Sequence, residues 1–241
     1  MLAAPTLAAI LLTGLAYGKA GFRELLSRLL RWRVGIRWYA VALLIAPLTM
    51  LAVLLTLSLV SPAFRPLLFV EEDPFGLLLF SVVVGLWVGI FEELGWMGFA
   101  VPTLLGRRSG VLGTGLIVGF LYAAWSFLIV YLSQASDPTP GTLPMVIFLA
   151  VSLFTWLPAY RVLMVWVYER TNRSLLVVVM LMSASFVVAW NSLNNALAQT
   201  LTTLTAFYLV MTVVWCAIVA VVALAQGGHL TREPPPRRRV A

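Results

Sequence analysis

Seven long apolar segments follow one another along this chain, separated by short stretches of charged and turn residues. A helix needs about 20 apolar residues to cross the core of a bilayer, close to the length of each segment. No segment alternates apolar and polar residues as a barrel strand would, and a helix satisfies its own backbone groups in lipid. With 62% hydrophobic and 10% charged residues, the chain is too apolar for a water-soluble domain. We expect an all-α, polytopic membrane helix bundle of about seven transmembrane helices, at 2–18, 36–60, 75–93, 111–133, 142–166, 174–197 and 203–226.

Basic residues occupy every second connection between these segments. The other connections contain Arg65 with Glu71, Glu72 and Asp73, then Asp137, then no charge near Gln199. Because Lys and Arg remain on the cytoplasmic side of a membrane, the N-terminus is expected outside and the C-terminus in the cytoplasm. Membrane lipids are the expected partners of this charge, and nucleic acid is not implied. The basic residues are Lys19, Arg23, Arg28, Arg31, Arg33, Arg37, Arg107, Arg108, Arg170, Arg173, Arg232, Arg237, Arg238 and Arg239.

The first segment is the weakest of the seven, because Pro5, Gly14 and Gly18 interrupt it. A cleaved signal peptide is the alternative, which is disfavoured because no basic residue precedes the apolar part. The next stretch, from Phe22 to Tyr39, mixes arginines with leucines and tryptophans. It predicts either an amphipathic helix lying in the membrane interface or a plain topogenic loop.

The length of the chain leaves room for one transmembrane domain, over residues 1–226, and no separate soluble domain. Residues 227–241 are basic and proline-rich, and we expect them to form a disordered cytoplasmic tail. The single cysteine, Cys216, lies in an apolar segment, so no disulfide framework is expected.

Two adjacent acids, Glu92 and Glu93, end the long apolar run that begins at Phe75. An ionisable residue within a membrane span suggests a functional site, because its burial costs free energy. On a helix the two side chains point about 100° apart, so one can face a cavity while the other faces a neighbouring helix. A poorly hydrated carboxylate can act as a general base toward water. The alternative is a pair of solvated acids at the membrane interface.

Arg161 also lies in an apolar stretch and therefore needs a partner. Opposite charge points to Glu92 or Glu93, and a structural ion pair is favoured over a catalytic role. Asn191, Asn194 and Asn195 are explained by hydrogen bonds between helices or by a helix cap.

No metal or cofactor is expected within the membrane. The only histidine, His229, follows the last apolar segment, so a zinc site with histidine ligands cannot form among the spans. A serine nucleophile is also disfavoured, because no histidine lies in the spans and the only lysine, Lys19, lies in a connection.

Three short stretches, in order, resemble the motifs of the CPBP family of intramembrane endopeptidases, the CAAX prenyl protease and bacteriocin-processing (Abi-type) group. The run from Phe91 to Pro102 resembles the first motif, Glu-Glu-x-x-x-Arg. Gly119 to Phe127 resembles the second motif, Phe-x-x-x-His, and Leu181 to Phe186 resembles the third, which begins with His. The resemblance implies a CPBP-like core over about 75–200.

The resemblance implies that Glu92 activates the attacking water and that Glu93 is its neighbour in the site. The other motif positions differ from the family. Ser126 and Ser183 stand where the family has histidines, Met97 stands at the Arg position, Tyr122 at the Phe position, and Val187 where Asn or Asp is often found. Because both histidines are replaced, the resemblance implies a hydrolase fold with a degraded catalytic set.

Three functions remain open after this comparison of residues. The first is a weak endopeptidase that uses Glu92 with substitute donors such as Ser126, Ser183 and Tyr122. The second is a non-catalytic membrane protein for binding, immunity or regulation, a pseudoenzyme on the same fold. The third is a Glu-dependent cation or proton transporter, which the lack of an internal repeat disfavours. In each case we expect a multi-pass membrane protein, which the resemblance places in a bacterial inner membrane, and for the first two functions a membrane-bound peptide or protein as the partner.

Overall fold

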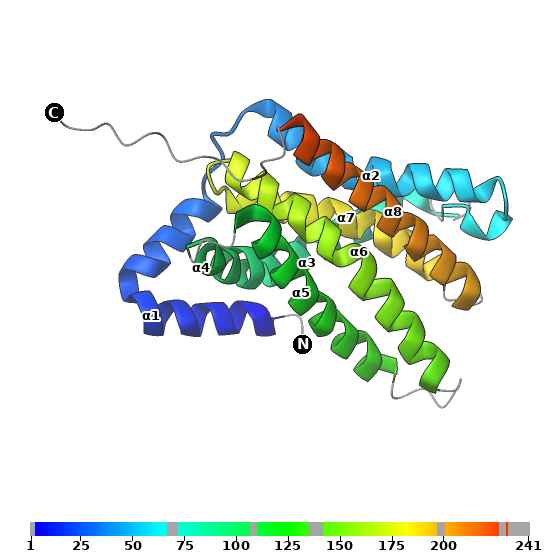
Figure 1. The fold of residues 1–241 in the computed structure, drawn as a ribbon, viewed down its shortest axis with the longest axis horizontal. Coiled ribbons are helices and arrows are strands. Elements are labelled where there is room, and N and C mark those ends of the chain that lie inside the picture. The colour runs from blue at the N-terminus through cyan, green and yellow to red at the C-terminus, as the bar shows by residue number, and fades with distance from the viewer. Residues whose placement is uncertain are drawn as a thin grey trace.

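The computed structural model describes residues 3–66, 72–106, 110–134, 142–196, 201–226 and 230, and within these residues every regular element is helical (Figure 1). The expected all-α bundle is confirmed. The third long helix continues through a π-helical segment, Trp96–Ala100, into a short helix, and a 3-10 turn, Pro62–Phe64, follows the second. The α-helices are α1 (Ala4–Leu29), α2 (Ile36–Ser58), α3 (Pro74–Gly95), α4 (Val101–Gly106), α5 (Gly110–Gln134), α6 (Thr142–Arg170), α7 (Leu175–Ala196) and α8 (Leu201–Ala225).

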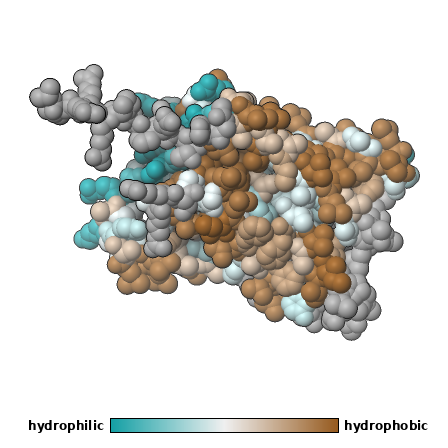
Figure 2. Space-filling view, in the orientation of Figure 1, coloured by the Kyte–Doolittle hydropathy of each residue, from teal (hydrophilic) through white to brown (hydrophobic). Residues whose placement is uncertain are grey.

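Five stretches among the described residues are long and apolar enough to cross a membrane, namely Ile36–Ser58, Pro74–Gly106, Gly110–Ile129, Val146–Arg170 and Thr205–Ala225. A sixth, α7, is apolar over Leu175–Val187. Large apolar side chains are exposed along these helices, and they cover most of the face seen in Figure 2. The protein is therefore a multi-pass membrane protein.

Helix α1 occupies the position of the first expected segment, and it does not qualify as a span. Gly18 has a φ of 56°, which breaks the helical path, and charged residues follow from Lys19 onward. The first half packs on α3, because the Thr6 hydroxyl donates a hydrogen bond to the carbonyl oxygen of Phe91. A Cβ atom added to Gly95 would lie 2.5 Å from the Cβ of Pro5. In this structure α1 is thus part of the bundle.

The second half of α1 corrects one expectation from the sequence. A single amphipathic helix over Phe22 to Tyr39 is wrong, because α1 ends at Leu29 and α2 begins only at Ile36. The intervening chain is tied to the turn between α6 and α7. The Arg31 guanidinium donates to the carbonyl oxygen of Asn172, and the Ser174 hydroxyl donates to the Arg31 carbonyl over 2.7 Å.

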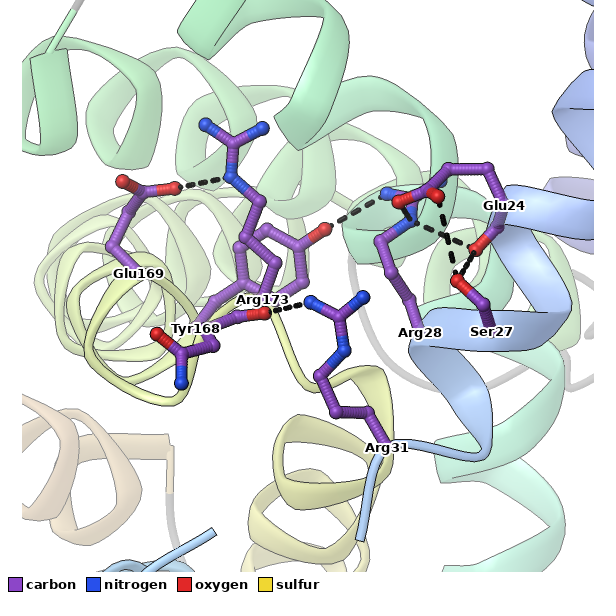
Figure 3. A network of polar contacts seen from close by, with 8 residues as sticks. Glu24, Ser27, Arg28, Arg31, Tyr168, Glu169 and Arg173 are labelled. Carbon is purple, nitrogen blue, oxygen red and sulfur yellow. Dashed lines mark hydrogen bonds and ion pairs between the residues drawn. The ribbon is translucent and has the colours of Figure 1, made fainter. Parts of the chain in front are cut away.

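Further polar contacts join α1 to the end of α6, where hydrophilic residues gather toward the left of Figure 2. Arg28 donates to the hydroxyl of Tyr168 over 2.8 Å and lies 3.4 Å from a carboxylate oxygen of Glu24 (Figure 3). Arg173 pairs with Glu169 at 2.9 Å. We call this part of the bundle the basic end, defined by Arg28, Arg31, Arg33, Arg37, Arg170 and Arg173.

Helix α6 lies deepest in the bundle, with 56% of its span buried against 22–33% for the other four. Helix α5 packs along α6, and α3 packs along α7. Glycines allow both pairs to approach closely, since a Cβ on Gly119 would lie 2.5 Å from the Cα of Pro158, and one on Gly89 would collide with the Ser183 Oγ. This packing brings α3, α5 and α6 together around the acids that end α3.

Several features predicted from the sequence lie outside the described residues. They are Glu71, Arg107, Arg108, Asp137, Gln199, His229 and, except for Leu230, the tail over 227–241.

Candidate active site

The two acids at the end of α3 are enclosed by protein. Glu92 is 4% exposed and Glu93 is fully buried. This burial excludes the alternative of two solvated acids at the interface. The π-helical segment that follows them changes the helical register at this point, a feature that often accompanies functional sites.

Arg161 of α6 takes one of these acids as its partner. Its Nη1 atom lies 2.7 Å from the Oε2 atom of Glu93, and neither side chain has any exposed area. The sequence left the choice between Glu92 and Glu93 open, because helical spacing alone does not say which acid faces α6. A buried pair of this kind stays charged only with close contact between its members.

Tyr122 of α5 joins this ion pair to the other acid. Its hydroxyl donates a hydrogen bond of 2.6 Å to the Oε2 atom of Glu92. The guanidinium carbon of Arg161 lies 3.7 Å from the centre of the Tyr122 ring, an arrangement for a cation–π interaction. Glu92, Glu93, Tyr122 and Arg161 therefore form one buried cluster from three helices, which we call the acidic cluster.

The acidic cluster has more negative than positive groups, because two carboxylates share one guanidinium. Several of its polar atoms have no hydrogen-bond partner among the described residues, namely Oε1 of Glu93 and both Nε and Nη2 of Arg161. The indole N–H of Trp125 lies near Glu92 and is also without a partner at normal hydrogen-bond distance. Buried polar atoms of this kind are suited to bind water or the polar atoms of a ligand.

The two serines that replace the motif histidines lie on different helices. Ser183 of α7 is buried, and its hydroxyl donates to the carbonyl oxygen of Val179 over 2.8 Å. It packs on Gly89, which lies one turn before Glu92 on α3. Ser126 is half-buried on α5, one turn beyond Tyr122.

The other motif positions add no polar group to the acidic cluster. Met97 is fully buried within the π-helical segment. Val187 lies on α7, one turn after Ser183. The side chains of Asn191, Asn194 and Asn195 lie outside the described residues.

An apolar groove opens beside Ser183, between α2, α3 and α7. It has a volume of about 420 Å³, and its walls include Leu48, Leu86, Ala184 and Val187. Leu48 and Leu86 are exposed on the surface of the bundle, so the groove opens sideways, toward the lipid around a membrane protein. The α3 residues in its walls, Leu78, Val82 and Leu86, precede the two acids on the same helix.

Gly119 controls how closely α5 carries Tyr122 to Arg161. An added Cβ would lie 2.5 Å from the Cα of Pro158 and 3.3 Å from the Cβ of Arg161. Gly119→Ala should therefore lower the free energy of unfolding by about 1–3 kcal/mol, as overpacking does. Unfolding in detergent by added denaturant measures this loss. Gly106→Ala is the control, because nothing lies within 4 Å of its added Cβ, and equal losses in the two variants would contradict the close contact.

A bundle of apolar helices with buried carboxylates, an arginine and an adjoining lateral groove defines a class, the multi-pass membrane proteins with an intramembrane polar site. Within that class, the model of the type II CAAX prenyl endopeptidase Rce1-like family matches residues 74–187, which run from the start of α3 well into α7. This match confirms the resemblance to the CPBP family over residues 74–187. A search of curated proteins gave no match to the chain.

The sequence motifs located the acids and the serines, and they did not indicate the contact between Tyr122 and both charged groups. Two hydrogen bonds of Tyr160 were also missed, one with Ser185 and one of 3.2 Å to the carbonyl oxygen of Leu181. These contacts fix α6 to α7 beside Arg161. A single-sequence signal for them does not exist, because spacing within one helix says nothing about which residue of another helix it meets.

Proposed function

We propose that this protein is a non-catalytic relative of the CAAX-type intramembrane endopeptidases that binds a membrane-anchored peptide or protein without cleaving it. It would act in the inner membrane of a bacterial cell, with its basic end in the cytoplasm, as a binding, immunity or regulatory protein. The helical fold and the adjacent acids resemble those of the family. The histidines and the arginine that would complete a hydrolytic site are replaced by Ser126, Ser183 and Met97.

One observation carries this proposal, namely that two of the three hydroxyls named as substitutes for the lost histidines are already engaged. Tyr122 donates its only proton to Glu92, and Ser183 donates to a backbone carbonyl of its own helix. Hydrolysis of an amide needs donors aimed at the oxygen on which negative charge develops. Removing one such donor costs about 10²- to 10³-fold in rate, so losing two leaves little activity.

The environment of Glu92 also favours binding over water activation. A general base must lie within hydrogen-bond reach of the water from which it takes a proton. One oxygen of Glu92 accepts the Tyr122 hydrogen bond, and Met97 contributes no charge where the family motif has arginine. The carboxylate remains suited to accept hydrogen bonds from a backbone N–H or another donor of a bound segment.

The groove between α2, α3 and α7 supports the choice of ligand. Its walls are almost wholly apolar, and two of its lining residues, Ser183 and Val187, pack on α3 at Gly85 and Gly89, within two turns of Glu92. An apolar polypeptide segment could lie in this groove while an unpaired backbone group meets Glu92. A soluble peptide would gain much less from such walls, because its side chains are hydrated before binding.

The experiment uses the purified chain in lipid nanodiscs and a library of fluorescent single-span membrane peptides. Ala184→Trp should fill the groove and weaken retention of bound peptides about tenfold or more, which corresponds to about 1.4 kcal/mol. The matched control is Ala217→Trp, because Ala217 is exposed on α8 and does not line the groove. Equal retention by the two variants would contradict binding in the groove, and cleavage products from the unmodified chain would contradict the non-catalytic assignment.

A further inference from the structure

A second cavity lies at the basic end, apart from the acidic cluster. It has a volume of about 620 Å³ and lies where α2 begins and where α6 and α8 end. Its walls include Arg33, Arg37, Trp38, Trp166, Arg170 and Gln226. Nothing in the proposed peptide-binding function uses this cavity.

The charge of the cavity is strongly one-sided, because three of its lining residues are arginines and none is an acid. The neighbouring basic residues already have partners, Arg28 with Glu24 and Tyr168, and Arg173 with Glu169 (Figure 3). Among the described residues, no carboxylate forms an ion pair with Arg33, Arg37 or Arg170. The cavity therefore presents guanidinium charge that its own walls leave unneutralised.

Aromatic rings lie against two of these arginines. The guanidinium carbon of Arg37 lies 5.6 Å from the centre of the Trp38 ring, and that of Arg33 lies 5.3 Å from the Trp32 ring. Trp38 in turn meets Trp166 edge to face at 5.2 Å. Contacts of this kind favour some side-chain conformations over others, which lowers the conformational entropy that binding costs.

Two further donors belong to residues in the walls of the cavity. The Nε atom of Arg170 and the indole N–H of Trp166 are buried and have no hydrogen-bond partner among the described residues. Helix α2 begins here at Ile36, with Gly35 as an N-cap that has no side chain and with no acid in the first turn, so its first N–H groups add positive potential. Guanidinium forks, an indole N–H and a helix N-terminus all favour a phosphate group.

The position of the cavity in the bundle points to the source of that phosphate. Three membrane-crossing helices end at its walls, so it lies at the level of the lipid headgroups. Beside it, Leu30, Trp32 and Ile36 are 63%, 61% and 83% exposed, which gives acyl chains an apolar surface next to the charged cavity. We propose that this cavity binds the phosphodiester headgroup of an anionic phospholipid, with the acyl chains along the start of α2.

The test compares two lipids with identical acyl chains, phosphatidylglycerol and phosphatidylcholine, binding to the full chain in detergent by native mass spectrometry. Arg33→Gln/Arg37→Gln should weaken phosphatidylglycerol binding about 10- to 30-fold. Both arginines are exposed, so the variant should fold normally, and its circular dichroism checks this. Lys19→Gln/Arg23→Gln removes the same charge from α1, away from the cavity, and should change binding less than about threefold.

Three results would overturn the proposal. Equal loss in the two double variants would mean that the lipid responds only to the overall charge of the basic end. Equal binding of phosphatidylglycerol and phosphatidylcholine would mean that the cavity does not select for the net negative charge of the headgroup. Inorganic phosphate that binds as tightly as phosphatidylglycerol, and in the same Arg33- and Arg37-dependent way, would identify a site for a small anion rather than for a lipid.

Discussion

Arg161→Met should lower the free energy of unfolding by about 3–5 kcal/mol. The substitution removes the only cation of the acidic cluster and leaves Glu93 buried without a counterion, beside a second buried acid. It also removes the guanidinium from the face of Tyr122. A titration with denaturing detergent, followed by tryptophan fluorescence, measures the change.

The double variant Glu93→Leu/Arg161→Met distinguishes the effect of an unpaired buried charge from the effect of lost side-chain packing. Replacing a whole buried ion pair by apolar residues is often neutral or stabilising, so the double variant should recover most of the lost stability. Arg23→Met, at an exposed position on α1, should change stability by less than about 0.5 kcal/mol. If the single Arg161 variant is as stable as the unmodified chain, the pair is not a stabilising element.

Placing histidine at both motif positions, Ser126→His/Ser183→His, should create cleavage of membrane-anchored peptides at least about 10²-fold above the unmodified chain. The buried carboxylate and the groove are retained, and the apolar groove beside Ser183 offers room for a larger side chain. Two imidazoles would supply the proton donors that the hydroxyls do not. Mass spectrometry of the peptide products measures the rate.

The control for this restoration is the triple variant that adds Glu92→Gln, which should return cleavage to the background. Either single histidine variant should remain close to background, since groups that act together in catalysis are not additive. Cleavage by the double histidine variant that survives Glu92→Gln would rule out Glu92 as the base. No cleavage at all from a folded double variant would mean that the cavity has diverged beyond the loss of the histidines.

The helical architecture could be predicted from the sequence, because lipid allows few backbone arrangements and the apolar segments are long. Each of the expected segments contains a long helix in the described residues. The structure of the stretch from Phe22 to Tyr39 was harder to predict, because its amphipathic spacing is compatible with one continuous helix. Contacts from Arg31 to the distant turn at Asn172 and Ser174 hold the chain out of helical form instead.

The candidate site was predictable only in part. Glu92, Glu93 and Arg161 could be selected from the sequence because burying an ionisable side chain within a membrane costs free energy and often marks a functional site. The pairing of Arg161 with Glu93, and the bridge that Tyr122 makes to Glu92, depend on how α5 and α6 pack through Gly115 and Gly119. Such contacts are set by the meeting of separate helices, so residue spacing within one helix does not reveal them.

We propose that this protein has the fold of the endopeptidases and does not hydrolyse peptide bonds. The most direct measurement compares the unmodified chain with Glu92→Gln, both in lipid nanodiscs, for cleavage of the single-span peptide library over equal times. We predict the same background level for the two proteins, while both retain bound peptide. Cleavage by the unmodified chain that Glu92→Gln abolishes would contradict the claim and identify a working glutamate endopeptidase that needs no histidine.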